Sequence, residues 1–324
     1  MKSIILLVIV GSLLLVTASS AWAAAKPLVV ATIAPLAAIA SEVGGAEVDV
    51  EYIVPVTSDP HQYVPTLEDA ELAMQADLFL EIGKEPFLKS LPADRGRIKL
   101  TWRDWIDAGL YVEYENPHYI WLYPPNVVKV AQLIAEKLSL LDPQNKEFYI
   151  RNAEKFAGRV ERLKEWGLRY VESHGVSGAP IVAVGSHFIP LLEFYGFKVI
   201  GPLLMGEGQM PNPSDTAQFA QEAKRSGAGI IVVLYSQRDA DEGRIGRAIA
   251  EEIGAGIVYL HGAQFSGGDD YVEYIKYTMA TLVGGLEAGT PRHAGESLLE
   301  AVVSILGILL VIETFMLVRW WRWR

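Results

Sequence analysis

Three of the six histidines stand in sequence contexts that suit a metal site. His61 and His118 each follow a proline, and His187 comes soon after a run of apolar residues. Neutral imidazole is a good ligand for borderline divalent ions, of which Zn²⁺ is the first candidate. Proline fixes the φ angle beside a ligand, and so lowers the entropy lost in holding the loop ready. One histidine in a loop is usually an ordinary polar residue, but the three together predict a metal-binding site.

The chain alternates short apolar runs, rich in β-branched residues, with amphipathic stretches. The expected strands are 28–32, 48–55, 78–82, 181–184, 198–204, 230–235 and 257–260. Strands that alternate with helices in this way predict βα units and parallel sheets. Ligands of such sheets bind beyond the carboxyl ends of the strands, where the loops of His61, His118 and His187 can converge. A fourth histidine, His261, also comes immediately after an expected strand.

Residues 143–174 separate the two groups of strands. Apolar residues recur there at helical spacing, and no strand signal is present. A helix of this length, about 45 Å at 1.5 Å per residue, would be a rigid link between two lobes. We therefore expect an α/β protein with an N-terminal lobe at 26–142, a linking backbone helix at 143–174, a C-terminal lobe at 175–290 and a cleft between the lobes. One doubly wound sheet with a long surface helix is the alternative.

Both ends of the chain carry apolar segments. Residues 1–25 combine a basic start, a short apolar run and a small-residue cleavage pattern, which predict a secretory signal peptide. Residues 299–319 are mostly apolar and lead into a basic and aromatic tail at 320–324, which predicts a single transmembrane anchor after a juxtamembrane stretch at 291–298. We therefore expect the protein on the extracytoplasmic face of the cell membrane, held by this C-terminal helix. Glu313 is unusual in such a segment, because a carboxylate in lipid is costly.

Composition narrows the function further. The formal net charge of −11 argues against nucleic acid as a partner and is compatible with cation binding. The chain has no cysteine, so it offers no disulfide, no thiolate ligand and no cysteine that could carry a lipid. Without the two ends, about 270 residues remain, which is enough for two lobes with their own cores.

Several segments form a recognisable series in chain order. They are Asp59-Pro60-His61-Gln62-Tyr63-Val64-Pro65-Thr66, Asn116-Pro117-His118-Tyr119-Ile120-Trp121-Leu122-Tyr123-Pro124, Leu141-Asp142-Pro143, Gly185-Ser186-His187, Phe194-Tyr195-Gly196 and Tyr271-Val272. This series resembles the solute-binding proteins of zinc and manganese ABC transporters, the cluster A-I metal-binding family. The resemblance implies two βα lobes joined by a backbone helix, with a metal ion in the interlobe cleft. It also implies a binding protein, not an enzyme, that delivers the metal to a membrane permease powered by a cytoplasmic ATPase.

The resemblance also implies a ligand set. His61, His118 and His187 would be the first three ligands, matched position by position. The family generally takes its fourth ligand from an acidic residue after the last strand of the second lobe, where this chain has His261. We therefore expect His261 to complete a shell of four imidazoles. Nearby carboxylates would orient the rings and offset the charge of the ion, or one of them would ligate in place of His261. These carboxylates are Glu207, Asp239, Asp241, Asp269 and Asp270.

Selectivity and other functions stay open from the sequence. Imidazole ligands favour zinc over manganese, but cobalt, nickel and copper ions also bind such sites. The His-rich loop common in zinc-specific members is missing here. A zinc hydrolase would need a general base near an open coordination position, and the chain has no HExxH segment. A binding protein for an organic or chelated ligand, and a surface protein for cell adhesion, would fit the same architecture.

Overall fold

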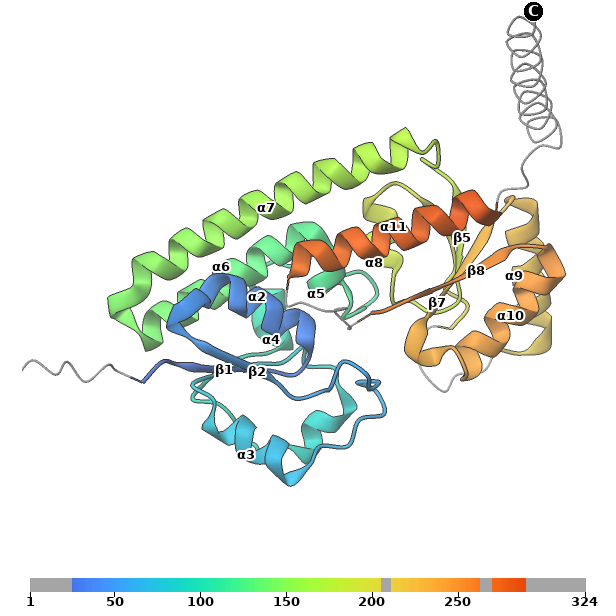
Figure 1. Ribbon diagram of the computed structural model, residues 1–324. Coiled ribbons are helices and arrows are strands. Elements are labelled where there is room, and N and C mark those ends of the chain that lie inside the picture. Colours follow the sequence, from blue (N-terminus) through green and yellow to red (C-terminus); the bar gives the residue numbers. More distant parts are fainter. Residues whose placement is uncertain (1–24, 205–210, 263–269, 290–324) are drawn as a thin grey trace, which may run out of the picture.

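Figure 1 shows a computed structural model of the chain, which describes residues 25–204, 211–262 and 270–289. Strands in these residues are short, and most of their side chains are buried. They are β1 (Leu28–Ala31), β2 (Asp49–Tyr52), β3 (Leu78–Leu80), β4 (Ile98–Leu100), β5 (Pro180–Ala183), β6 (Lys198–Ile200), β7 (Ile230–Leu234) and β8 (Gly256–Leu260).

Helices connect these strands. They are α2 (Ala34–Gly44), α3 (Leu67–Gln75), α4 (Trp102–Asp107), α5 (Tyr119–Leu122), α6 (Pro124–Leu141), α7 (Lys146–Ser173), α8 (Ile189–Phe194), α9 (Pro213–Arg225), α10 (Asp241–Ile253) and α11 (Tyr271–Gly289). Short 3₁₀ turns complete the connections: η1 (Gly45–Glu47), η2 (Pro86–Ser90), η3 (Pro143–Asn145) and η4 (Tyr235–Gln237).

The strands form two separate parallel sheets of the same design. The first has the order β2-β1-β3-β4 and the second the order β6-β5-β7-β8. In each sheet the chain leaves the first strand toward one side and then returns to the other side, which opens a crevice at the carboxyl ends of β1 and β3, and of β5 and β7. The predicted fold class is therefore confirmed: the protein is an α/β protein with two parallel-sheet lobes.

The long helix α7 joins the two lobes and runs along both of them (Figure 1). One face of this helix is apolar and buried, and the opposite face carries charged residues. The buried residues include Tyr149, Ala153, Phe156, Val160 and Leu163. Their spacing of three or four residues places them on one side of the helix, where they pack against the rest of the protein. Burial along its length makes α7 a rigid connection between the lobes.

Helix α11 begins beside the N-terminal lobe, runs back to the C-terminal lobe and contacts α7, α2 and β8 (Figure 1). Figure 1 shows it running beside α7. At its first residue, Tyr271 is fully buried and its ring meets that of Phe156 at 5.9 Å. A single apolar cluster therefore includes residues of both lobes and of both long helices. This shared core fixes how the lobes face each other.

None of the helices in the described ranges 25–204, 211–262 and 270–289 has the length and apolar character that crossing a membrane requires. The predicted signal peptide at 1–25 falls almost wholly outside these ranges. The predicted juxtamembrane stretch, anchor and tail at 291–298, 299–319 and 320–324 lie entirely outside them.

Candidate metal centre

His61 lies in the loop between β2 and α3, beyond the carboxyl end of the first sheet. Its backbone N–H donates to Asp59 Oδ1 at 2.9 Å, which closes a local turn around Pro60. The loop ends where Thr66 caps α3, because the Thr66 hydroxyl accepts from the Asp69 N–H and the Asp69 carboxylate accepts from the Thr66 N–H. The His61 loop is thus fixed at both ends.

His118 lies in a tight turn before the short helix α5. Tyr114 and Glu115, just ahead of it, adopt φ angles of 50° and 54°, which are strained for residues other than glycine. The side chain of Asn116 holds this turn in place through hydrogen bonds. Its Oδ1 accepts the backbone N–H of His118 at 3.1 Å and lies 2.7 Å from the ring Nδ1, while its Nδ2 donates to the Ser186 carbonyl at 2.9 Å.

His187 lies between β5 and α8, at the carboxyl end of the second sheet. Its side chain is buried, and its Nδ1 lies 3.6 Å from Glu242 Oε2 without a hydrogen-bond partner. Glu242, in the first turn of α10, is also buried, and its Oε1 accepts the Leu234 N–H at 2.9 Å. Gly185 makes room for this arrangement, since a Cβ there would lie 2.7 Å from Glu242 Oε2 and 2.9 Å from His187 Nδ1.

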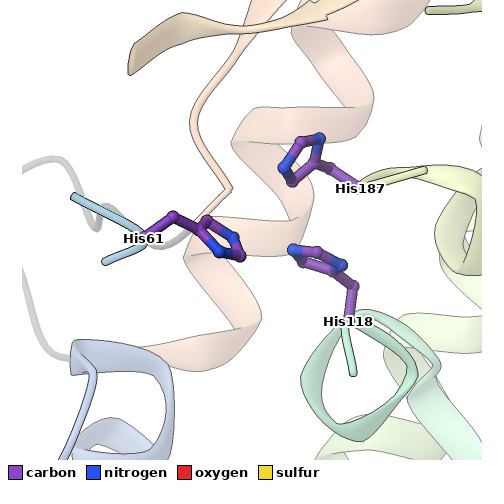
Figure 2. A group of neighbouring side chains, drawn as sticks. All are labelled: His61, His118 and His187. Carbon is purple, nitrogen blue, oxygen red and sulfur yellow. The ribbon is translucent and has the colours of Figure 1, made fainter. Parts of the chain in front are cut away.

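These three histidines come together, two from the N-terminal lobe and one from the C-terminal lobe (Figure 2). Each offers one ring nitrogen, and the three nitrogens lie within 4.8 Å of one another. Nitrogens that share a tetrahedral zinc ion at about 2.05 Å would lie roughly 3.3 Å apart. Small ring movements would therefore be enough to bring all three into contact with one ion. Within the residues that the structure describes, this is the one such group of histidine and carboxylate side chains.

His261 lies near the group but outside it. Its ring stacks on Tyr235, with centroids 4.1 Å apart and planes 28° apart. Both His261 and the three grouped histidines line one cavity of about 60 Å³, which also has apolar walls from Ile33, Ile82, Trp121 and Leu234. A volume of this size has room for an ion and a few water molecules.

Hydrogen bonds between the lobes close the cavity. Gln237 Nε2 donates to Asp59 Oδ2 at 2.6 Å, so the carboxylate that shapes the His61 loop also binds the C-terminal lobe. Trp121 Nε1 donates to the Gly262 carbonyl at 2.9 Å, next to His261. With the bond from Asn116 to Ser186, these contacts tie each histidine loop to the opposite lobe.

Burial keeps the grouped imidazoles neutral. It lowers the pKa of His187 to about 3, with a further effect from His61, and it lowers the pKa of His118 well below the usual value, with added repulsion from His187 and His61. Burial also lowers the pKa of His61, although Asp59 opposes the change. A ligating imidazole must be neutral, and near pH 7 these three rings are in the protonation state that can bind a metal ion. Burial raises the pKa of Glu242 to about 7, which the Leu234 N–H opposes.

The other carboxylates named from the sequence are used elsewhere or lie outside the described residues. Asp239 pairs with Arg238 at 2.8 Å, and Asp241 pairs with Arg244. Asp270 pairs with Arg159 at 2.6 Å. Glu207 and Asp269 lie outside the described residues. None of the three described aspartates lines the cavity of the histidines.

Sequence reasoning missed two residues that contact the histidines or face them, Asn116 and Glu242. Asn116 stands in the Asn116-Pro117-His118 segment, and an asparagine two residues before a histidine is well placed to bind the backbone of that histidine. Glu242 gave a weaker signal. It is one of several acidic residues at the start of a helix, and only the fold shows which one is turned inward.

Comparisons with known proteins agree with this arrangement. The sequence profile of the ZnuA family, described as zinc-uptake complex component A, periplasmic, matches residues 29–285. The manganese-binding lipoprotein MntA of Halalkalibacterium halodurans is 26% identical over 265 residues, which cover 80% of this chain and 88% of that protein. The manganese ABC transporter substrate-binding lipoprotein PsaA of Streptococcus pneumoniae serotype 4 is 32% identical over 154 residues, covering 43% of this chain and 49% of PsaA, about half its length. A crystal structure of ZnuA superposes with a TM-score of 0.66 at 25% identity, covering 81% of this chain and 99% of that one.

The comparisons contradict the expected localisation. MntA and PsaA are named lipoproteins, a class attached to membranes by a covalently bound lipid. We expected a C-terminal transmembrane helix at 299–319 to hold the protein on the extracytoplasmic face. That prediction rested on an apolar run near the lower length limit for a membrane span, with Glu313 inside it. Hydropathy alone does not establish how a chain is attached, and the prediction of a transmembrane anchor is wrong.

Proposed function

Because this chain belongs to the ZnuA family of zinc-uptake component A proteins, we propose that it captures one zinc ion between its lobes and delivers it to the permease of an ABC transporter. Its place among these relatives makes it a metal-binding substrate-binding protein of an ABC transporter and not an enzyme. Beyond this membership, the proposal specifies that the ion is zinc, which residues bind it, and that the ion passes to the permease.

The observation that carries the proposal is the convergence of three imidazoles from two lobes. His61 and His118 come from one lobe and His187 from the other, and their ligand nitrogens lie within 4.8 Å of one another. Burial lowers the pKa of all three. Neutral imidazole is the form that ligates a divalent ion, so three such rings facing one cavity can all bind the same ion.

Zinc is the ion that best suits these ligands. The relatives differ on this point, since MntA and PsaA are named for manganese and the ZnuA family for zinc. Manganese favours carboxylate, carbonyl and water oxygens, whereas imidazole nitrogen suits zinc. In the described residues the group holds three nitrogen donors and no carboxylate, which supports zinc over manganese.

We extend the proposal to His261 as the fourth ligand. It lines the same cavity and follows β8 directly. To reach the ion, its ring would leave the stack on Tyr235, a contact worth on the order of 1 kcal/mol. A zinc–nitrogen bond in the completed shell outweighs that loss. Glu242 would remain behind His187 and offset part of the charge of the ion.

Capture by both lobes also suggests how the ion is passed on. Binding would hold the lobes together through the metal as well as through the bonds Gln237 to Asp59 and Trp121 to Gly262. A closed, loaded form would then present a different surface to a permease than an open, empty form. Separation of the lobes would split the ligand set and release the ion.

Competitive metal titration of chelator-treated protein tests the proposal. We expect one zinc ion per chain, bound more tightly than manganese, and a higher melting temperature with zinc. At free zinc a thousandfold above Kd the gain in unfolding free energy would be about 4 kcal/mol. Tighter binding of manganese would contradict the choice of ion. A melting temperature indifferent to zinc, manganese and chelator would contradict metal capture altogether.

A further inference from the structure

The side chain of Asn116 joins the loops of two of the grouped histidines. Its side chain contacts the backbone and ring of His118 and the carbonyl of Ser186, the residue before His187. The residue is buried, with 9% of its surface exposed. Burial therefore makes these protein groups the main hydrogen-bond partners of the amide.

The hydrogen bonds fix which end of the amide faces which neighbour. The Ser186 carbonyl can only accept, so the Asn116 group that faces it must be the NH₂. The backbone N–H of His118 can only donate, so the group that faces it must be the oxygen. A flipped amide would place two acceptors against each other on one side and two donors on the other, and both contacts would be lost.

This orientation determines the tautomer of His118. The ring Nδ1 lies 2.7 Å from Asn116 Oδ1, an atom that can only accept. At that distance Nδ1 must carry the hydrogen. In the neutral ring Nε2 then carries the lone pair, and Figure 2 shows the outer nitrogen of His118 pointing toward the space between His61 and His187.

We infer that Asn116 is a positioning residue for metal capture, which holds His118 as the Nδ1–H tautomer and keeps that ring in register with the His187 loop of the other lobe. This inference rests on the proposed function, because the orientation of the His118 ring matters for capture only if that ring binds the metal. His118 presents its lone pair to the cavity before any metal arrives. No tautomer change has to precede binding, and the ring loses little rotational freedom when the ion binds.

Substitutions of Asn116 separate its contact with His118 from its contact with the Ser186 carbonyl. Asn116→Asp keeps an acceptor for His118 but cannot donate to the Ser186 carbonyl. Asn116→Ala removes both contacts. Asn126→Ala is a matched control: Asn126 is buried and bonds to Tyr111 and Tyr119 beside the same turn, but it contacts no histidine. The control should lower stability without changing the His118 tautomer.

The decisive measurement is the pair of ring ¹⁵N chemical shifts of His118 in metal-free protein at pH 8, assigned with a His118→Ala spectrum. We expect a protonated Nδ1 in wild type, Asn116→Asp and Asn126→Ala, and a mixture of tautomers in Asn116→Ala. We also expect Asn116→Ala to weaken zinc binding about 10- to 100-fold. Asn116→Asp, which folds around the same acceptor, should lose less affinity.

The inference is overturned if His118 in the wild-type protein carries its proton on Nε2. It is also overturned if the Asn116→Ala protein keeps the wild-type tautomer of His118 and the wild-type zinc affinity. If the tautomers behave as expected but wild type binds no metal, the hydrogen-bond assignment is supported and the proposed function is contradicted.

Discussion

The buried carboxylate of Glu242 faces the buried ring of His187, with Oε2 3.6 Å from Nδ1. A carboxylate behind a ligating histidine accepts its second N–H, fixes the ring and raises its basicity. Here a short movement of either side chain would complete that bond. The carboxylate itself is held by the Leu234 N–H and sits in space left by Gly185.

Replacing Glu242 should therefore weaken metal binding without removing a ligand. We predict that Glu242→Gln, which keeps the shape, raises the zinc Kd by about 10- to 100-fold. Glu252→Gln, on the exposed end of the same helix, is the control and should leave the Kd unchanged. Zinc titration by calorimetry measures both. Equal affinity in the two variants would mean that the Glu242 carboxylate does not support His187.

Gly185 provides an independent test of the same contact. A Cβ at this position would lie within 3 Å of both Glu242 Oε2 and His187 Nδ1. We predict that Gly185→Ala moves the carboxylate and the ring apart and weakens zinc binding. Gly175→Ala is a poor control, because Gly175 has a φ of 66°. Gly284→Ala, where a Cβ would meet open space, is a better one. Zinc affinity in Gly185→Ala equal to that of Gly284→Ala would contradict the prediction.

The metal-free protein should lose stability as the pH falls below about 6.5, the ordinary pKa of histidine. The histidines of the unfolded chain then bind protons that the same histidines in the folded chain do not bind, which lowers the free energy of unfolding. The reason is that the pKa of His187 is lowered to about 3 in the folded protein and those of His118 and His61 are also lowered.

Carboxylates with raised pKa values act in the opposite direction, because their folded forms hold protons that the unfolded forms release. Burial raises the pKa of Glu242 to about 7, and it also raises the pKa of Glu85 and of Glu193. Because the pKa of His187 falls to about 3 and that of His118 well below its usual value, we expect the imidazoles to dominate.

Melting temperatures of chelator-treated protein between pH 7 and pH 5 test this balance. We expect a decline for wild type and a steeper one for Glu242→Gln, which lacks one of the opposing groups. A melting temperature that rises on acidification over this interval would contradict the expected dominance of the histidines over the buried carboxylates.

His261 should change position when metal binds. In the structure its ring stacks on Tyr235, whereas the proposed shell needs it beside the ion. We predict that His261→Ala weakens zinc binding at least ~10-fold, since losing a ligand costs no less than losing its support. Tyr235→Leu, which removes the stacked ring, should not weaken it. If His261→Ala binds zinc like wild type, water completes the shell.

Much of the fold follows from local sequence patterns. The continuous apolar run at 230–235 predicts the buried strand β7, and the helical spacing over 143–174 predicts α7 because it is long and periodic. Strand β4 escaped notice because its three residues, Ile98–Leu100, include a lysine and give no alternating pattern. Its place at the edge of the sheet comes from pairing with β3 and not from its own sequence.

The site could be predicted from the sequence only in part, because some of its residues are brought together only by the folded chain. Three histidines could be selected because proline and strand ends mark their loops. Glu242 could not be separated from Asp239 and Asp241 by sequence, since all three precede or begin the same helix. In the folded chain Glu242 is the buried one, and its neighbour Gly243 packs so closely against Arg238 that a Cβ would lie 1.9 Å from the backbone oxygen. Such packing is a property of the folded chain.

Zinc titration of the three ligand variants tests the central claim most directly. Wild-type protein, freed of metal, should bind one zinc ion, and His61→Ala, His118→Ala and His187→Ala should each weaken binding by ~10-fold or much more. His174→Ala, which removes an exposed histidine at the end of α7, should bind like wild type. If all three variants at the grouped histidines keep wild-type affinity, the metal is held elsewhere and the account is contradicted.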